Sequence, residues 1–270
     1  MSKHAVEDIV RQVTAAFNSG KPDQARRLCV DGLIRQPSDP MLNHLLAAVL
    51  FSNGEIQSAR THVETSLATR PRNAAAHLLA ARIARAVSDF SGALAHLDRA
   101  IAIAPQREAF LEKARTLEQL GLWSQAREAW QAILEVVPQN IEAAARLGRL
   151  AWQDGDYAVA RTLLERAVAG DAPASAWFDL GLVRQDLRDY DGAASSYRKA
   201  LEMKTDFAEA ALNLGVVLQE SGDLDNAMRA YSEAYRLRPQ MFGTIAMALT
   251  SAPRGRLWLD ETSLRRSLVV

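Results

Sequence analysis

Alanine recurs at seven positions along this chain of 270 residues, and the steps between them are always 33 or 34 residues. These positions are Ala25, Ala59, Ala93, Ala126, Ala160, Ala193 and Ala227. A fixed period of this length is typical of stacked structural units rather than of one globular core. Five residues before the alanines stand Gly20, Gly54, Ser88, Gly121, Gly155, Arg188 and Gly222. Twelve residues after them stand Pro37, Pro71, Pro105, Pro138, Ala172, Thr205 and Pro239.

The segment 208–241 shows what one period encodes. Its first half places apolar or small residues at three- and four-residue spacing, on one face of a helix: Ala211, Leu214, Gly215 and Leu218. Its second half carries a similar stripe: Leu224, Ala227, Tyr231 and Ala234. Gly222 lies between the stripes, where glycine can take the left-handed conformation that closes a helix. Pro239 then ends the second helix. Each period therefore predicts two antiparallel helices joined by a short turn.

These residues resemble the tetratricopeptide repeat family. The resemblance is carried by Trp-Phe-Asp-Leu-Gly at 177–181, Asp-Tyr-Asp-Gly-Ala at 189–193 and Tyr197, and also by Leu-Gly at 147–148 before Gly-Asp-Tyr at 155–157. It implies an all-α fold, a right-handed superhelix (α-solenoid) of antiparallel helix pairs. The predicted repeats span 6–39, 40–73, 74–106, 107–140, 141–173, 174–207 and 208–241.

Three repeats depart from the family pattern. The first has Gln12 and Val13, and the fourth has Lys113 and Ala114, where the family has Leu-Gly. The sixth has Arg188 at its turn, and it also places Arg184 on the face expected to be buried. We expect local packing to differ there within an unchanged fold.

Composition restricts the partner classes. The 32 basic and 32 acidic side chains cancel, which disfavours nucleic acid as a ligand. No run of 18 uncharged apolar residues occurs, so no membrane span is expected. Charges near the N-terminus disfavour a signal peptide. The single cysteine, Cys29, lies at the phase of a buried second-helix residue and is read as a core side chain. The simplest expectation is a cytoplasmic protein.

No constellation of residues indicates catalysis. His62 and His96 share one phase of adjacent repeats and are read as neighbouring outer-surface side chains; two histidines alone make a poor metal site. The Gly-Asp pairs fall in helix–helix turns rather than after a strand, so they do not form a phosphate loop. We expect no enzyme activity, no metal and no cofactor.

In the tetratricopeptide repeat family, the first helix of each repeat usually lines the partner-binding groove. The N-terminal part of that face carries Val10, Phe17, His44 and Phe51, with Met41 and Leu78 nearby. Two interpretations are open. These residues contact a partner helix, or the superhelix turns them toward neighbouring helices.

The middle of this face is basic. Arg82, Arg115 and Arg149 occupy the same phase in three successive repeats, and Arg85, Arg146 and Trp152 lie near the same surface. Arginine forks suit carboxylates, so this ladder is either a site for an acidic ligand or a set of salt bridges between repeats. Glu108, Glu112 and Glu118 lie at phases suited to neutralising part of it.

The C-terminal part of the face is again apolar, with Phe178, Leu182, Leu212 and Val216. Together the three zones suit an extended or helical segment with hydrophobic ends and an acidic middle. The leading prediction is a non-catalytic scaffold that binds a protein or peptide in its groove. The alternative is an accessory or regulatory subunit of an enzyme, such as a glycosyltransferase or a polysaccharide-biosynthesis system.

Residues 242–270 leave the period. Residues 242–250 are predicted to form a helix that caps the last repeat. Asp260 or Thr262 is a candidate cap for a short terminal helix. Leu257, Trp258 and Leu259 are too apolar for a free tail. The tail folds back on the solenoid, pairs with another chain and so mediates self-association, or is a disordered docking motif.

Overall fold

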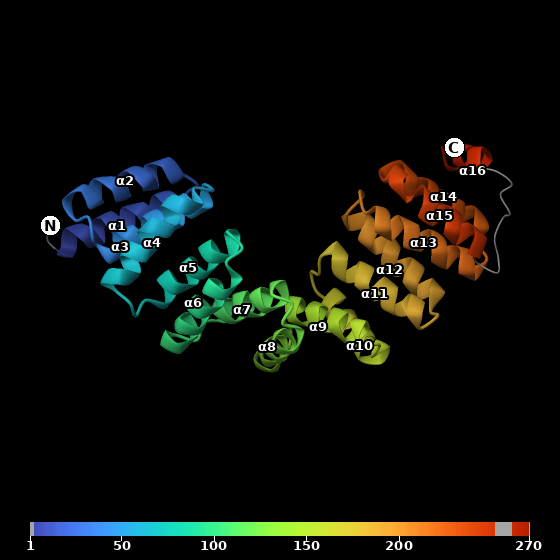
Figure 1. The fold of residues 1–270 in the computed structure, drawn as a ribbon, viewed down its shortest axis with the longest axis horizontal. Coiled ribbons are helices and arrows are strands. Elements are labelled where there is room, and N and C mark those ends of the chain that lie inside the picture. The colour runs from blue at the N-terminus through green and yellow to red at the C-terminus, as the bar shows by residue number, and fades with distance from the viewer. Residues whose placement is uncertain (1–2, 252–260, 270) are drawn as a thin grey trace. The chain divides into compact units, whose positions relative to one another are not determined.

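Every regular element among the residues that the computed structural model describes, 3–251 and 261–269, is helical, as Figure 1 shows. The predicted all-α class is therefore confirmed. The first eight α-helices are α1 (Lys3–Asn18), α2 (Pro22–Arg35), α3 (Pro40–Ser52), α4 (Ile56–Thr69), α5 (Ala74–Ala86), α6 (Phe90–Ile103), α7 (Arg107–Gln119) and α8 (Trp123–Val136). They are followed by α9 (Ile141–Gln153), α10 (Tyr157–Val168), α11 (Ala174–Asp186), α12 (Tyr190–Met203), α13 (Ala208–Ser221), α14 (Leu224–Leu237), a 3₁₀ turn η1 (Pro239–Met241), α15 (Phe242–Ser251) and α16 (Glu261–Val269).

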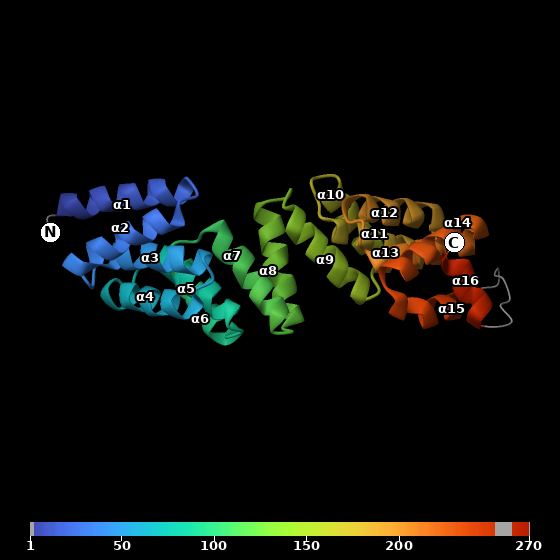
Figure 2. The same ribbon diagram turned by 90° about the horizontal axis from the view of Figure 1, so that it is seen from above.

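The chain divides into two compact units, Met1–Ala129 and Trp130–Val270, with the boundary inside α8. In the first unit each helix from α1 to α6 packs against the next one in the chain, and the same holds from α9 to α13 in the second unit (Figures 1 and 2). The first helix of one pair also touches the first helix of the following pair, as α3 touches α5 and α9 touches α11. Each unit is thus a stack of helix pairs in which burial is shared between neighbours.

The turn between the two helices of each pair has the same backbone conformation. All seven residues at the predicted turn phase have a positive φ, from 60° at Arg188 to 92° at Gly222. Five of them are glycines, while Ser88 and Arg188 hold this conformation with a side chain. The next residue often caps the second helix: the side chain of Asp89 accepts a hydrogen bond from the Gly92 amide at 2.9 Å. Asp156, Asp189 and Asp223 cap α10, α12 and α14 in the same way.

The two helices of a pair approach most closely where a small residue of the first faces a large residue of the second. A β-carbon built on Gly148 would overlap Leu164, and one built on Gly181 or Gly215 would overlap the ring of a tyrosine, Tyr197 or Tyr231. Both tyrosines are fully buried, and each donates its hydroxyl proton to a glutamine of the first helix, Gln185 or Gln219, at 2.8 Å. Ala160, the recurring alanine of this pair, is also fully buried.

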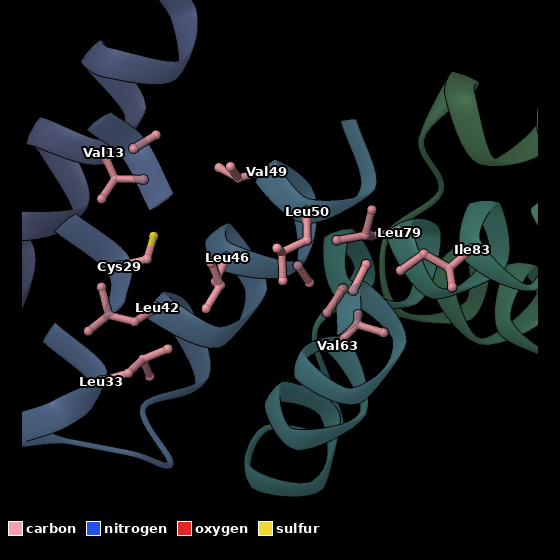
Figure 3. Close-up of a cluster of buried hydrophobic side chains, with 14 of the residues drawn as sticks. Val13, Cys29, Leu33, Leu42, Leu46, Val49, Leu50, Val63, Leu79 and Ile83 are labelled. Carbon is pink, nitrogen blue, oxygen red and sulfur yellow. The ribbon is translucent and has the colours of Figure 1, made fainter. Parts of the chain in front are cut away.

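In the first unit the core is a continuous apolar cluster drawn from α1 to α5 (Figure 3). Val13, Cys29 and Leu42 have no exposed surface in this cluster. Burial raises the pKa of the Cys29 thiol to about 12, so the group is a neutral core side chain, as expected from its phase.

Arg184, which the sequence places on a buried face of α11, donates hydrogen bonds from both Nη atoms, while its buried Nε atom makes none with the residues that the structure describes. Its Nη1 atom donates to the carbonyl oxygen of Gly192 at 3.2 Å and to the Ser196 hydroxyl at 3.0 Å. Its Nη2 atom donates to Glu165 Oε1 at 3.1 Å. The long side chain thus joins α11 to both α12 and α10, which explains how the sixth repeat tolerates this residue.

The end of the second unit is covered by two helices that do not follow the period. The predicted capping helix at 242–250 is present as α15 and buries Ile245 and Leu249. Helix α16 packs against α14 and buries Leu264 and Leu268 in the same cluster. Arg265 of α16 donates to the Tyr235 hydroxyl at 3.0 Å and stacks over the Phe242 ring at 3.9 Å. The predicted docking residues Leu257, Trp258 and Leu259 lie outside the described residues, as does Asp260.

Candidate partner-binding site

In the first unit the predicted basic residues meet at one acidic side chain. Arg82 and Arg85 of α5 and Arg115 of α7 all contact Glu112, whose side chain is 10% exposed. Glu112 Oε1 lies 3.4 Å from Arg82 Nε and 3.3 Å from Arg115 Nη1, while Oε2 bonds Arg85 Nη1. The three arginine side chains are 40%, 27% and 35% exposed, so the carboxylate lies beneath a partly open layer of guanidinium groups.

In the second unit the other predicted basic residues surround Asp179 of α11. Arg149 Nη1 donates to Asp179 Oδ1 at 3.4 Å, and Arg146 is close enough to act on the same carboxyl group. Burial raises the pKa of Asp179 to about 6, although the two arginines act in the opposite direction. Trp152 lies near the same end of α9 and donates its indole proton to Asp186 at 2.6 Å.

The two sites use the same spacing. Arg82 precedes Glu112 by thirty residues, and Arg149 precedes Asp179 by thirty. In both cases the arginine lies on the first helix of one pair and the acid on the first helix of the next pair. Sequence reasoning found the arginines from their shared phase, and it included Glu112 among the neutralising acids. It missed Asp179, which the thirty-residue spacing would have revealed.

The predicted apolar residues of the C-terminal zone are half-buried and pack against the core of the second unit. The Phe178 ring lies 5.7 Å from the ring of Tyr197 and 4.8 Å from that of Phe207. Leu182, Leu212 and Val216 pack against the same cluster. These four side chains therefore keep only part of their surface for a ligand.

The predicted residues of the N-terminal zone differ in exposure. Val10 and Phe51 are half-buried against the first core, whereas Phe17 is 38% exposed. His44 is half-buried as well, and burial lowers the pKa of its imidazole. Phe17 is thus the most open of the four predicted contact residues.

Two polar pairs inside the first unit were not anticipated. His96 lies against the buried His77, their Nδ1 atoms 3.0 Å apart, and His62 Nδ1 lies 2.8 Å from Oδ1 of the buried Asn43. His77 Nε2 donates to the Pro71 carbonyl at 2.9 Å, so its Nδ1 accepts the proton of His96. The two outer histidines thus face inward partners rather than each other. The two residues of each pair are nineteen positions apart, and this shared spacing is the feature of the sequence from which the pairs could have been predicted.

No group of three or more His, Cys, Asp or Glu side chains in 3–251 and 261–269 is arranged to hold a metal ion. Over the same ranges, no helix combines the length and the apolar character that crossing a bilayer requires.

Comparison with known proteins gives a consistent result. A sequence model of the tetratricopeptide repeat family matches residues 44–108, 111–176 and 178–242, which together make up most of the chain. Among curated proteins, none matches it by sequence.

Solved structures match by fold. Pseudomonas aeruginosa pilF superposes with a TM-score of 0.68 at 19% identity, covering 75% of this chain and 93% of that one. A chain of the APC/C hetero-tetramer Cut9–Hcn1 gives 0.67 at 18% identity, over 88% of this chain and 48% of that one. A tetratricopeptide repeat protein from Parabacteroides merdae gives 0.62 at 15% identity, over 90% and 96%. At these identities the likeness concerns the fold alone.

Proposed function

Because the chain belongs to the tetratricopeptide repeat family, we propose that it is a non-catalytic scaffold that binds an acidic segment of a partner protein. The contacts are assigned to two basic sites. The first comprises Arg82, Arg85 and Arg115, and the second comprises Arg146 and Arg149 with Trp152 beside them. The half-buried apolar residues Phe178, Leu182, Leu212 and Val216 flank the second site and provide contacts for hydrophobic residues of the same segment.

The observation that carries this proposal is that more than one arginine contacts the single carboxylate of Glu112. Arg82 and Arg85 are two cations that share this single buried carboxylate, and both stay partly exposed. A guanidinium group has five donor N–H bonds in a rigid fork, so one carboxylate cannot occupy the donors of both. Since Arg82 and Arg85 project from one helix three residues apart, they are also held in place before a ligand arrives.

The direct test uses a fluorescein-labelled hexaglutamate peptide and measures its binding by fluorescence anisotropy. The variant carries Arg82→Glu, Arg115→Glu and Arg149→Glu, and we expect its affinity to fall about tenfold or more. Raised salt should weaken binding to the parent protein, because the attraction is electrostatic. The matched control reverses three other exposed arginines, Arg35, Arg72 and Arg161. It changes the net charge equally and should retain affinity within about twofold.

Three results would contradict the proposal. The first is a parent protein that does not bind hexaglutamate. The second is an equal loss in both triple variants, which would mean that binding follows net charge alone. The third is unchanged affinity in the first variant, which would leave the arginines as internal salt bridges between helix pairs.

The alternative function is that of an accessory subunit of an enzyme. It would use the same binding surface as the scaffold, but the partner would be an enzyme. Capture of partners from the native host, followed by mass spectrometry, separates the two. Recovery of an enzyme by the parent protein, lost in the triple arginine variant, would favour the accessory role. Recovery of non-enzymatic proteins would favour the scaffold.

A further inference from the structure

The two basic sites share one arrangement of charges. In each unit, a partly exposed arginine on the first helix of one pair contacts a buried acid on the first helix of the next pair. Arg82 contacts Glu112, and Arg149 contacts Asp179, each thirty residues later in the sequence. The acid side chains are only 10% and 8% exposed, while Arg82 and Arg149 are 40% and 49% exposed. The acid thus approaches the guanidinium group from inside and leaves its outer side open.

Burial disfavours the ionised form of Asp179 in the folded state. Burial raises the pKa of this group from its ordinary 3.8 to about 6, so the folded state favours the neutral acid over the ion pair. The stability contributed by the neutral form is present below about pH 4 and is lost as the pH rises through about 6. At neutral pH the ionised carboxylate therefore weakens the fold despite Arg149 and Arg146. Asp179 also acts electrostatically on the buried hydroxyl group of Tyr197.

The contacts of Glu112 are those that a carboxylate of a bound peptide would make. Its two oxygens divide the guanidinium groups between them: Oε1 takes Arg82 and Arg115, and Oε2 takes Arg85. A carboxylate from a bound peptide would be held by the same forks in the same manner. The adjacent helix pair thus supplies a carboxylate, which is the same chemical group that the proposed partner would bring.

We propose that Glu112 and Asp179 are internal competitors: they hold some of the arginine donors, and a partner's acidic groups must displace them to engage the whole guanidinium fork. This rests on the proposed function. An intramolecular group competes at a high effective concentration, so a lone carboxylate would bind weakly and a segment with several acidic side chains would be selected. The internal acids then set both the strength and the selectivity of binding at each basic site.

The test removes each acid without changing its shape, using Glu112→Gln and Asp179→Asn. We expect each variant to bind labelled hexaglutamate about two- to fivefold more tightly than the parent, which is the scale of one ion pair. The matched control is Glu55→Gln, which removes the acid of another ion pair, between Arg26 of α2 and Glu55 just before α4, at 2.7 Å; this pair shares no residue with the arginine sites. The control makes the same change in net charge and should bind like the parent.

The outcomes separate this inference from the function on which it rests. If hexaglutamate binding is lost in the triple arginine variant but Glu112→Gln and Asp179→Asn bind no more tightly than Glu55→Gln, the inference is overturned and the proposed function stands. If the parent does not bind, the proposed function itself fails. Circular dichroism checks that each variant folds. If Glu112→Gln does not fold, Glu112→Asp replaces it, because this variant withdraws the carboxylate by one methylene group. It should show a smaller gain in affinity. If neither Glu112→Asp nor Asp179→Asn gains affinity, the inference is overturned.

Discussion

Ser88 and Arg188 hold a backbone conformation that L-amino acids avoid. Their φ angles are 61° and 60°, and each amide donates to a carbonyl three residues earlier, at 3.0 Å for Ser88 and 2.9 Å for Arg188. The sequence predicted both turns from phase alone, because the five other units have glycine there. It did not predict the polar pairs nearby, since a side chain as long as arginine or histidine can reach several partners. His96 meeting His77 rather than His62 is one result of that freedom.

Replacing Ser88 or Arg188 by glycine should stabilise the protein by about 0.5–1 kcal/mol. A left-handed conformation costs an L-residue about 1–2 kcal/mol, and the greater freedom of glycine in the unfolded chain offsets part of the gain. Urea unfolding measures the change. The reverse substitution, Gly54→Ala or Gly155→Ala, should cost about 1 kcal/mol, although nothing lies within 4 Å of the added β-carbon. A Ser88→Gly or Arg188→Gly variant less stable than the parent would show that the turn is not strained.

At the scale of helices, packing depends on a size balance between residues sixteen positions apart. Gly181 stands opposite Tyr197 and Gly215 opposite Tyr231, whereas smaller second residues accompany larger first ones, as in Ala47 with Val63 and Val13 with Cys29. The recurring phase predicted a buried residue on each second helix, as for Cys29, but it did not predict this pairing of sizes, and Ala114 before the buried Trp130 departs from it. The sequence did not reveal how Arg184 is accommodated by Glu165, Gly192 and Ser196, since only the sixth repeat has an arginine at this position.

Gly181→Ala should destabilise the second unit by about 1–3 kcal/mol, because the methyl group overlaps the Tyr197 ring and overpacking forces the helices apart. Gly243→Ala is the matched control. Gly243 is also helical, but no atom lies within 4 Å of an added β-carbon, so the alanine should be neutral or stabilise by up to about 1 kcal/mol. Equal effects of the two substitutions on urea unfolding would refute the size-balance argument.

At the scale of the whole chain, the repeat period stops before the second unit ends, and helices α15 and α16 follow it. Helix α15 was predicted from its apolar composition, whereas the contacts of α16 with Tyr235 and Phe242 were not. A sequence without a period gives no register, and so it does not indicate which earlier helix a terminal segment will cover. In the structure, Leu264 and Leu268 fix the position of α16, because both are buried in the same apolar cluster as residues of α14 and α15.

Truncation after Ser251 should lower the melting temperature of the second unit, because Leu264 and Leu268 no longer cover α14. Truncation after Met241 should lower it further and promote aggregation, since Ile245 and Leu249 are then lost as well. Circular dichroism and light scattering measure both effects. The substitution Leu268→Ala should act in the same direction as the shorter truncation, while Val269→Ala, at a side chain that is 75% exposed, should not. A parent-like melting temperature after loss of α16 would contradict this role for the helix.

The sixteen- and thirty-residue spacings of the buried pairs also bear on how the chain reaches its native state. Contacts that join residues so close in sequence give a low contact order, and each needs only a short loop to close. Folding can then nucleate at any helix pair and spread to the adjacent one, without waiting for the two ends of the chain to meet. Amide protons should accordingly exchange with solvent in blocks, each the size of one pair. A lesion such as Gly181→Ala would speed exchange in α11, α12 and their immediate neighbours while leaving α3 and α4 protected.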